Sequence, residues 1–241
     1  VTYIPISALN GDNIVDRSQL ITWYDGKPLL EFLEEVEINN DVNLTDARFQ
    51  VQLVIRPQTE ELHDYRGYAG EVISGIYKKG DKVTVLPAGI ETTISHLQAG
   101  GKEVDEAFAP QSVTIQLADD IDISRGDSIV KSDNLPKVSN ELEVLLCWMD
   151  EKPLIAGNKY YLQHNSRLVR AIVKEVEYKL DVNSLQRQPV EGNVKLNEVV
   201  KATIKTASPI VYDGYETLNA NGSAILIDET SNSTVAAVLF K

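Results

Sequence analysis

Few side chains in this sequence have the types and spacings that catalysis requires. The three histidines are His63, His96 and His164. None of them has a second histidine or a cysteine at the spacing of a metal-binding motif, so no metal site is predicted. The acidic residues from Asp119 to Asp122 follow a strand-like run. They indicate a solvated turn rather than a pair of catalytic carboxylates.

The sequence also lacks the glycine-rich motifs that hold phosphates. Neither Gly-x-x-x-x-Gly-Lys-Ser/Thr nor Gly-x-Gly-x-x-Gly occurs among the 241 residues. Without a ring of backbone amides and a lysine, the β- and γ-phosphates of a nucleotide are not held. We therefore predict no catalytic residue and no cofactor in this chain, and we expect it to hydrolyse no nucleotide by itself.

Composition argues against several classes of partner. The 36 acidic and 23 basic residues give a formal net charge of -13, which repels the phosphate backbone of nucleic acids. No run of about 18 apolar residues occurs, so no membrane contact is expected. Cys147 is the only cysteine. It rules out an intrachain disulfide and, with the acidic composition, favours a cytoplasmic location.

The start of the chain predicts the end of a nucleotide-binding α/β domain. Residues 2–6 form a short β-run that leads to Ser7, Ala8 and Leu9 and then to a polar, glycine-containing turn. A helix is expected from Pro28, because its fixed φ and missing N–H suit the first helical turn. Strand, small-residue loop and helix together make the last unit of a doubly wound sheet.

The predicted helix has one apolar stripe, formed by Leu29, Phe32, Leu33 and Val36. Residues three and four apart lie on one face, so this stripe is expected to pack on a sheet or a neighbouring domain. No earlier strand and helix unit is present. Residues 1–38 are therefore predicted to be the C-terminal remnant of a domain whose catalytic part is missing, and the polar residues 39–46 are predicted to be a linker.

From residue 47 onward the clear elements alternate apolar and polar residues, which indicates β-strands. In the first run, one face is expected to hold Phe49, Val51, Leu53 and Ile55, and the other face Gln50 and Gln52. Similar runs occur at residues 82–86, 92–97 and 113–117. Closing such a sheet removes exposed edges, so residues 47–135 are predicted to form a small barrel.

Glycines and turns add to this organisation. Sharp bends or positive φ values are expected at Gly67, Gly70, Gly75, Gly80 and Gly89. A second barrel or sandwich is predicted after the turn-rich residues 132–136. Its strand candidates are residues 142–148, 159–163, 169–180, 198–205, 224–228 and 234–240. The predicted fold class is therefore mainly β, with two consecutive antiparallel β-domains after a short α/β remnant.

The order of these elements resembles the translational GTPases related to elongation factor Tu. Residues 5–9, Pro-Ile-Ser-Ala-Leu, resemble their fifth guanine-nucleotide motif, in which the backbone after the serine meets the edge of guanine. The resemblance implies that Ser7, Ala8 and Leu9 contact guanine in an intact P-loop GTPase domain. It also implies that residues 47–135 and 136–241 are barrels like the second and third domains of elongation factor Tu.

A closer resemblance, through the whole chain, is to the large GTPase subunits of bacterial ATP sulfate adenylyltransferases. Residues 65–70, Tyr-Arg-Gly-Tyr-Ala-Gly, are the most discriminating segment, and residues 85–89, 122–127 and 225–228 support it. The resemblance implies a subunit that binds GTP and Mg and hydrolyses GTP. Its small partner subunit makes adenosine 5'-phosphosulfate and pyrophosphate from ATP and sulfate. Because the GTPase motifs are absent here, this chain is expected to serve docking and transmission.

The expected partners are the small adenylylating subunit and the missing GTPase domain. Candidate contact residues are the turn Arg66, Gly67 and Tyr68 and the loop Ser124, Arg125 and Gly126. Arginine and tyrosine often anchor interfaces. The alternative is that these glycines only shape barrel corners and that Arg66 pairs locally. Two other functions stay open: a tRNA-binding module of a translation factor, which the acidic charge opposes, and a self-standing β-rich scaffold that binds protein.

Overall fold

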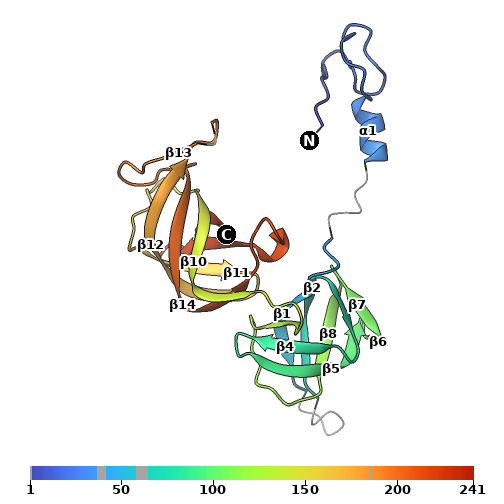
Figure 1. Cartoon of the computed structure of the whole chain (residues 1–241), viewed down its shortest axis with the longest axis vertical. Helices are drawn as coiled ribbons and strands as arrows, with labels where there is room; N and C mark the ends of the chain where they lie inside the picture. Colours follow the sequence, from blue (N-terminus) through green and yellow to red (C-terminus); the bar gives the residue numbers. More distant parts are fainter. Residues whose placement is uncertain (1, 37–41, 58–64, 185) are drawn as a thin grey trace. The chain divides into compact units, whose positions relative to one another are not determined.

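The structure is a computed structural model that describes residues 2–36, 42–57, 65–184 and 186–241 (Figure 1). The chain divides into two compact units, Val1–Asp41 and Val42–Lys241. Of the predicted linker at residues 39–46, residues 39–41 lie outside the described residues. Each unit is described by itself.

The first unit contains one short helix, α1 (Leu29–Glu35), which follows Pro28 as predicted. Its first N–H groups have no side-chain cap. Instead, the N–H of Leu29 donates to the carbonyl of Asn13, and the N–H of Leu30 donates to that of Ile14, both at 2.9 Å. These bonds satisfy donors that a helix leaves unpaired at its start.

The expected strand at residues 2–6 is not formed. Among the described residues no second strand pairs with it, and a strand needs a neighbour to complete its hydrogen bonds. Only an isolated antiparallel bridge joins Ser7 to Asp12. The apolar stripe of α1 is also not packed within this unit: α1 has no buried residue, and Leu33 is 58% exposed.

The first barrel consists of antiparallel strands that close on themselves. Its strands are β1 (Arg48–Ile55), β2 (Gly67–Ser74), β3 (Ile76–Lys78), β4 (Lys82–Leu86), β5 (Ile90–Ala99), β6 (Lys102–Val104), β7 (Glu106–Phe108), β8 (Ser112–Leu117) and β9 (Ser128–Lys131). Six of them follow the order β4-β9-β1-β2-β8-β5, and β5 pairs with β4 to close the ring. β6 extends from β5, and β3 pairs with β7. Apolar side chains from these strands fill one core.

A β-bulge in β1 changes the faces that sequence alternation predicts. Val51 pairs with Gly70 and Leu53 with Ala69, so Gln52 has no partner of its own on β2. A bulge places two residues opposite one and re-aims the side chains that follow. The prediction that Leu53 shares the core face with Val51 is therefore wrong: Val51 is fully buried, whereas Leu53 is 60% exposed.

The glycines of this barrel fall into two groups. Gly75, Gly80 and Gly89 have positive φ, as predicted for turns. Gly67 and Gly70 instead lie within β2, which corrects the expectation of bends there. A Cβ at Gly70 would lie 2.3 Å from the carbonyl oxygen of Gln50. Glycine is required at this position by the close approach of two strands.

The second barrel repeats the closed antiparallel arrangement. Its elements are β10 (Lys137–Trp148), β11 (Lys159–His164), β12 (Arg167–Leu180), β13 (Arg187–Gln188), β14 (Val199–Tyr212), the 3-10 helix η2 (Asn219–Asn221), β15 (Ser223–Asp228) and β16 (Thr234–Phe240). Six strands follow the order β11-β15-β16-β10-β14-β12, and β11 pairs with β12 to close the ring. β13 extends from β12. The prediction of a mainly β chain with two antiparallel barrels is confirmed.

Candidate functional site

The candidate guanine-contact residues lie in a tight turn of the first unit. The N–H of Ser7 donates to the carbonyl of Asp12 at 3.1 Å, and the N–H of Gly11 donates to the carbonyl of Ser7 at 2.8 Å. Leu9 is 95% exposed. The N–H groups of Ala8 and Leu9 have no hydrogen-bond acceptor among the described residues. Two exposed backbone donors after a serine fit the contact that the family resemblance implies.

The candidate turn at Arg66, Gly67 and Tyr68 is part of the wall of the first barrel. Tyr68 is 1% exposed, its hydroxyl donates to the carbonyl of Ile121 at 2.9 Å, and burial raises its pKa. The ring is therefore a core group, which corrects its assignment as a contact residue. Gly67 begins β2, and Arg66 forms a local ion pair with Asp120.

The candidate loop Ser124, Arg125 and Gly126 closes with Asp127 into a compact turn. The N–H of Ser124 donates to Oδ2 of Asp127 at 2.8 Å, and the N–H of Asp127 donates to the carbonyl of Ser124 at 3.1 Å. Gly126 has a φ of 91°. Arg125 donates from Nη1 to the carbonyl of Gln52 at 2.6 Å, the residue that the β1 bulge leaves without a partner.

This loop also contacts the start of β12 in the second barrel. Oδ1 of Asp127 lies 3.1 Å from Nη1 of Arg167, and both side chains are more than four-fifths buried. A Cβ at Gly126 would lie 3.1 Å from the Cα of Arg167, so the two backbones approach closely. The loop predicted as a contact candidate therefore lies where the two barrels meet.

A second link between the barrels is centred on Arg48, the first residue of β1. Its Nε lies 2.8 Å from Oδ2 of Asp213, and its Nη2 lies 2.9 Å from Oδ1. The side chains of this pair are 4% and 11% exposed. The remaining N–H groups donate to Ala47 and Asn134. All five guanidinium donors are therefore used, as a buried arginine requires.

The hydrogen bonds continue from this pair in both directions. Asn221 donates from Nδ2 to Oδ2 of Asp213 at 2.8 Å. Asn134 donates from Nδ2 to Oδ1 of Asp46 at 2.6 Å, and Asn43 donates to Oδ2 of Asp46 at 2.7 Å. The hydrogen bonds from Asn43 and then Asn134 lower the pKa of Asp46. We call Asn43, Asp46, Arg48, Asn134, Asp213 and Asn221 the Arg48 network.

Sequence reasoning missed this network. The local sign of the network in the sequence is that Arg48 stands at the start of a strand, directly before Phe49, which faces the core. Nothing in the sequence pairs Arg48 with Asp213, because 165 positions separate them. Through the network, residues 43–46, which lead into the first barrel, are tied to the end of β14 in the second.

His164 is buried next to the network, at 0% exposure. Its Nε2 lies 3.2 Å from the carbonyl of Asn221, which fits donation from this nitrogen. Burial lowers the pKa of His164 to about 4, so the ring is neutral at pH 7. His63 lies outside the described residues. In the described part of the chain, no group of three or more histidine, cysteine and carboxylate side chains is arranged to hold a metal ion.

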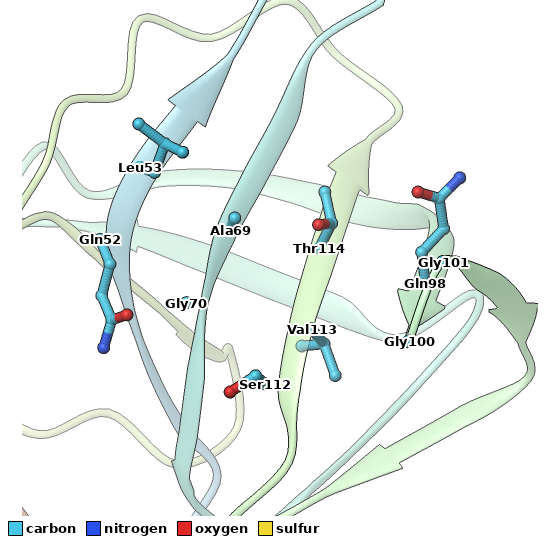
Figure 2. Close-up of a pocket in the computed structure, with 10 residues that line it drawn as sticks. All are labelled: Gln52, Leu53, Ala69, Gly70, Gln98, Gly100, Gly101, Ser112, Val113 and Thr114. Atoms are coloured by element: carbon cyan, nitrogen blue, oxygen red, sulfur yellow. The ribbon is translucent and has the colours of Figure 1, made fainter.

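Two adjoining clefts lie on the outer surface of the first barrel. The first, of about 340 Å³, is lined by Gln52, Leu53, Ala69, Gly70, Gln98, Gly100, Gly101, Ser112, Val113 and Thr114 (Figure 2). The second, of about 500 Å³, reaches the second barrel and is lined by Gln50, Gln52, Glu71, Ile73, Arg125, Asn165, Ser166 and Ala220. Gln52 belongs to both. Amide and hydroxyl side chains predominate among the polar residues described in the two linings, and the one carboxylate is that of Glu71.

Comparison with known proteins identifies relatives of both barrels. Residues 141–240 match the family described as GTP-eEF1A C-terminal domain-like. The bifunctional enzyme CysN/CysC of Mycobacterium tuberculosis is 47% identical over 238 residues, which are 98% of this chain and 39% of that protein. Sulfate adenylyltransferase subunit 1 of Bacteroides fragilis is 43% identical over 236 residues, 98% of this chain and 48% of that protein. The chain thus spans about half, or less, of these relatives.

Solved structures show the same fold at low sequence identity. The crystal structure of sup35 complexed with GMPPNP has a TM-score of 0.74 at 17% identity, covering 98% of this chain and 57% of that one. Translation elongation factor SelB from Methanococcus maripaludis has a TM-score of 0.65 at 16% identity, covering 88% of this chain and 46% of that one. Among the described residues, no helix is long and apolar enough to cross a bilayer.

The two kinds of likeness agree. The structural likenesses establish the barrel fold. The sequence identity to sulfate adenylyltransferase subunit 1 of Bacteroides fragilis, 43% over nearly the whole chain, is much higher than the 17% identity to sup35. The predicted resemblance is thereby confirmed. This chain is a homologue of a segment of sulfate adenylyltransferase subunit 1, with the β-barrel fold of the elongation-factor-like GTPases.

Proposed function

We propose that this chain is the β-barrel portion of the GTP-hydrolysing subunit of sulfate adenylyltransferase. In the full-length protein it couples GTP turnover to the synthesis of adenosine 5'-phosphosulfate from ATP and sulfate by a small adenylylating subunit. The barrels dock that subunit and transmit the state of the GTPase domain. The proposed location is the cytoplasm.

The length of the sequence similarity carries this proposal. At 43% identity over 98% of this chain, the Bacteroides fragilis protein is named as a subunit of sulfate adenylyltransferase. A protein named as a subunit has a partner chain. We propose the small adenylylating subunit as that partner, and the acidic net charge of -13 opposes a nucleic acid in its place.

The links between the barrels support a transmitting role. Arg48 with Asp213, and Asp127 with Arg167, join the first barrel to the second through largely buried ion pairs. Coupling between distant sites can be carried by packed and hydrogen-bonded elements. We propose that a change that reaches residues 43–46 is passed to both barrels through these contacts.

We propose that the full-length protein binds GTP and Mg, and that the phosphates and Mg are held by residues outside these 241. Within this chain, Ser7, Ala8 and Leu9 would contact only the guanine edge, through backbone donors. The phosphate-binding motifs are absent from the sequence. We therefore propose that this chain alone turns over no nucleotide.

The test uses the full-length protein and its purified small subunit. Association is measured by calorimetry at micromolar concentration, and GTP hydrolysed is counted per adenosine 5'-phosphosulfate formed. The Arg167→Met variant removes one link between the barrels, and we expect it to raise that ratio severalfold. Arg170→Met is the matched control, because Arg170 lies on the same strand with a side chain that is 72% exposed.

Two results would contradict the proposal. The first is no association between the full-length protein and the small subunit. The second is a rate of adenosine 5'-phosphosulfate synthesis that does not depend on GTP. If the Arg167 and Arg170 variants hydrolyse the same amount of GTP per adenosine 5'-phosphosulfate formed, the proposed docking still stands. In that case the loop at Asp127 has no transmitting role.

A further inference from the structure

The outer face of β2 forms the floor of a trough that crosses both clefts. Burial alternates along β2, and the residues that turn outward are Ala69, Glu71 and Ile73. Ala69 lines the first cleft, and Glu71 and Ile73 line the second. At about 3.3 Å per residue, the stretch from Ala69 to Ile73 is about 13 Å long. We call this surface the β2 trough.

The walls of the trough come from the neighbouring strands. The register places Leu53 of β1 opposite Ala69, Ala69 opposite Thr114 of β8, and Thr114 opposite Gln98 of β5. Figure 2 shows Leu53, Ala69 and Thr114 side by side on three adjacent strands. The small alanine between two larger residues leaves a channel that follows β2.

The bulge in β1 supplies the apolar contact of this channel. Because Gln52 is the extra residue, Leu53 turns out of the core and is 60% exposed at the edge of the trough. Bulges are common next to functional sites, where they re-aim a side chain. Leu53 therefore presents apolar surface at the cleft, and a partner gains free energy by covering that surface.

The far end of the trough is polar and reaches the second barrel. Arg125 is exposed there and is held by its bond to the Gln52 carbonyl. Asn165 and Ser166 of the turn between β11 and β12 complete this end. Among the described residues that line the two clefts, Arg125 and Glu71 are the only charged ones, so this lining is nearly neutral in a chain of net charge -13.

These features select the kind of ligand. A neutral lining of amide and hydroxyl side chains matches the donors and acceptors of a peptide backbone and does not attract phosphates. Both edges of β2 are paired, with β1 and β8, so the ligand cannot add to the sheet as a strand. It must lie on the face of the sheet and bond to side chains.

We propose that the β2 trough binds an extended segment, about four to five residues long, of the partner subunit. The segment places an apolar side chain against Leu53 and Ala69 and a carboxylate against Arg125. This inference rests on the proposed function for the identity of the partner. It adds the surface and the chemistry that the docking uses.

The test compares variants of the full-length protein for calorimetric binding of the purified small subunit. Leu53→Lys places a charge at the apolar end, and Ala69→Trp fills the floor. We expect each to weaken binding about tenfold or more. Val182→Lys is the matched control, since Val182 is 62% exposed in a turn of the second barrel. Arg125→Gln changes an exposed residue and tests the polar end if a trough variant fails to fold.

The outcomes separate the two proposals. Wild-type binding that Leu53→Lys, Ala69→Trp and Arg125→Gln all leave unchanged overturns the trough and keeps the proposed function. No binding by the wild type overturns both. If Leu53→Lys instead abolishes self-association in ultracentrifugation, or salt-sensitive binding of tRNA, the occupant is a second copy or a nucleic acid and the peptide assignment is wrong.

Discussion

Replacement of Arg48 by methionine tests whether the two barrels are held together by a buried ion pair. Methionine keeps much of the aliphatic volume of arginine and removes the charge. Asp213 then stays buried, with a side chain 11% exposed, and keeps only the Nδ2 donor of Asn221 among its side-chain partners. The carbonyl of Asn134 also loses its donor.

The expected cost follows from this burial. Removing one partner of a buried ion pair destabilises a protein by about 3 to 5 kcal/mol, because the other charge is left uncompensated. An exposed pair is worth only about 0 to 1 kcal/mol. With a urea m-value of about 3 kcal/mol/M, the cost expected for the buried pair lowers the urea concentration at the unfolding midpoint by at least about 1 M.

Urea unfolding of the 241-residue chain measures this shift. Tryptophan fluorescence reports it, since Trp148 is 2% exposed in the core of the second barrel. A double-mutant cycle with Asp213→Asn isolates the pair, and we expect a coupling energy of about 2 kcal/mol or more. A loss below about 1 kcal/mol for Arg48→Met, with no coupling to Asp213, would refute the role assigned to the network.

Two further predictions concern the cores of the barrels. In the folded state the pKa of His164 is about 4, whereas in the unfolded chain it is near the ordinary value of 6.5. Between these values the unfolded chain binds a proton that the folded state does not. The free energy of unfolding is therefore highest above about pH 6.5 and falls by about 3 kcal/mol as the pH drops to 4. His164→Gln should flatten this dependence in urea unfolding at pH 7 and pH 4.5, and equal slopes for both proteins would contradict the assignment. Gly70→Ala should cost roughly 1 to 3 kcal/mol, because the new Cβ meets the Gln50 carbonyl at 2.3 Å, whereas at Gly214 the nearest atom is 3.7 Å away. Thermal unfolding compares Gly70→Ala with Gly214→Ala, and matching midpoints would argue against the close approach of the strands.

The strands with regular alternation were predictable from the sequence. Residues 82–86 and 234–240 were predicted as strands and coincide with β4 and β16. In β16 the buried Ala236, Val238 and Phe240 alternate with the less buried Ala237 and Leu239. In β4 every residue after Lys82 is buried, and the strand was recognised from its valines and its polar flanks. β2 was missed because its glycines suggested bends, whereas they permit close contact between strands.

The candidate site was only partly predictable. The loop at Ser124, Arg125 and Gly126 was predicted from its serine and glycine, which favour turns. The structure places this loop at the junction of the barrels. Tyr68 has the residue type of an interface anchor, yet it is a core residue. Residue type does not reveal which face of a strand a side chain occupies when no regular alternation surrounds it.

By itself, the sequence determined the mainly β fold class, the family resemblance and the absence of phosphate-binding motifs, because periodicity and short motifs are local properties of the chain. The tertiary structure alone decided that Leu53 faces outward, since a bulge depends on the pairing of β1 with β2. It also decided that Arg48 meets Asp213 across 165 positions. Both are consequences of long-range pairing, which leaves no local signal in the residues that it brings together.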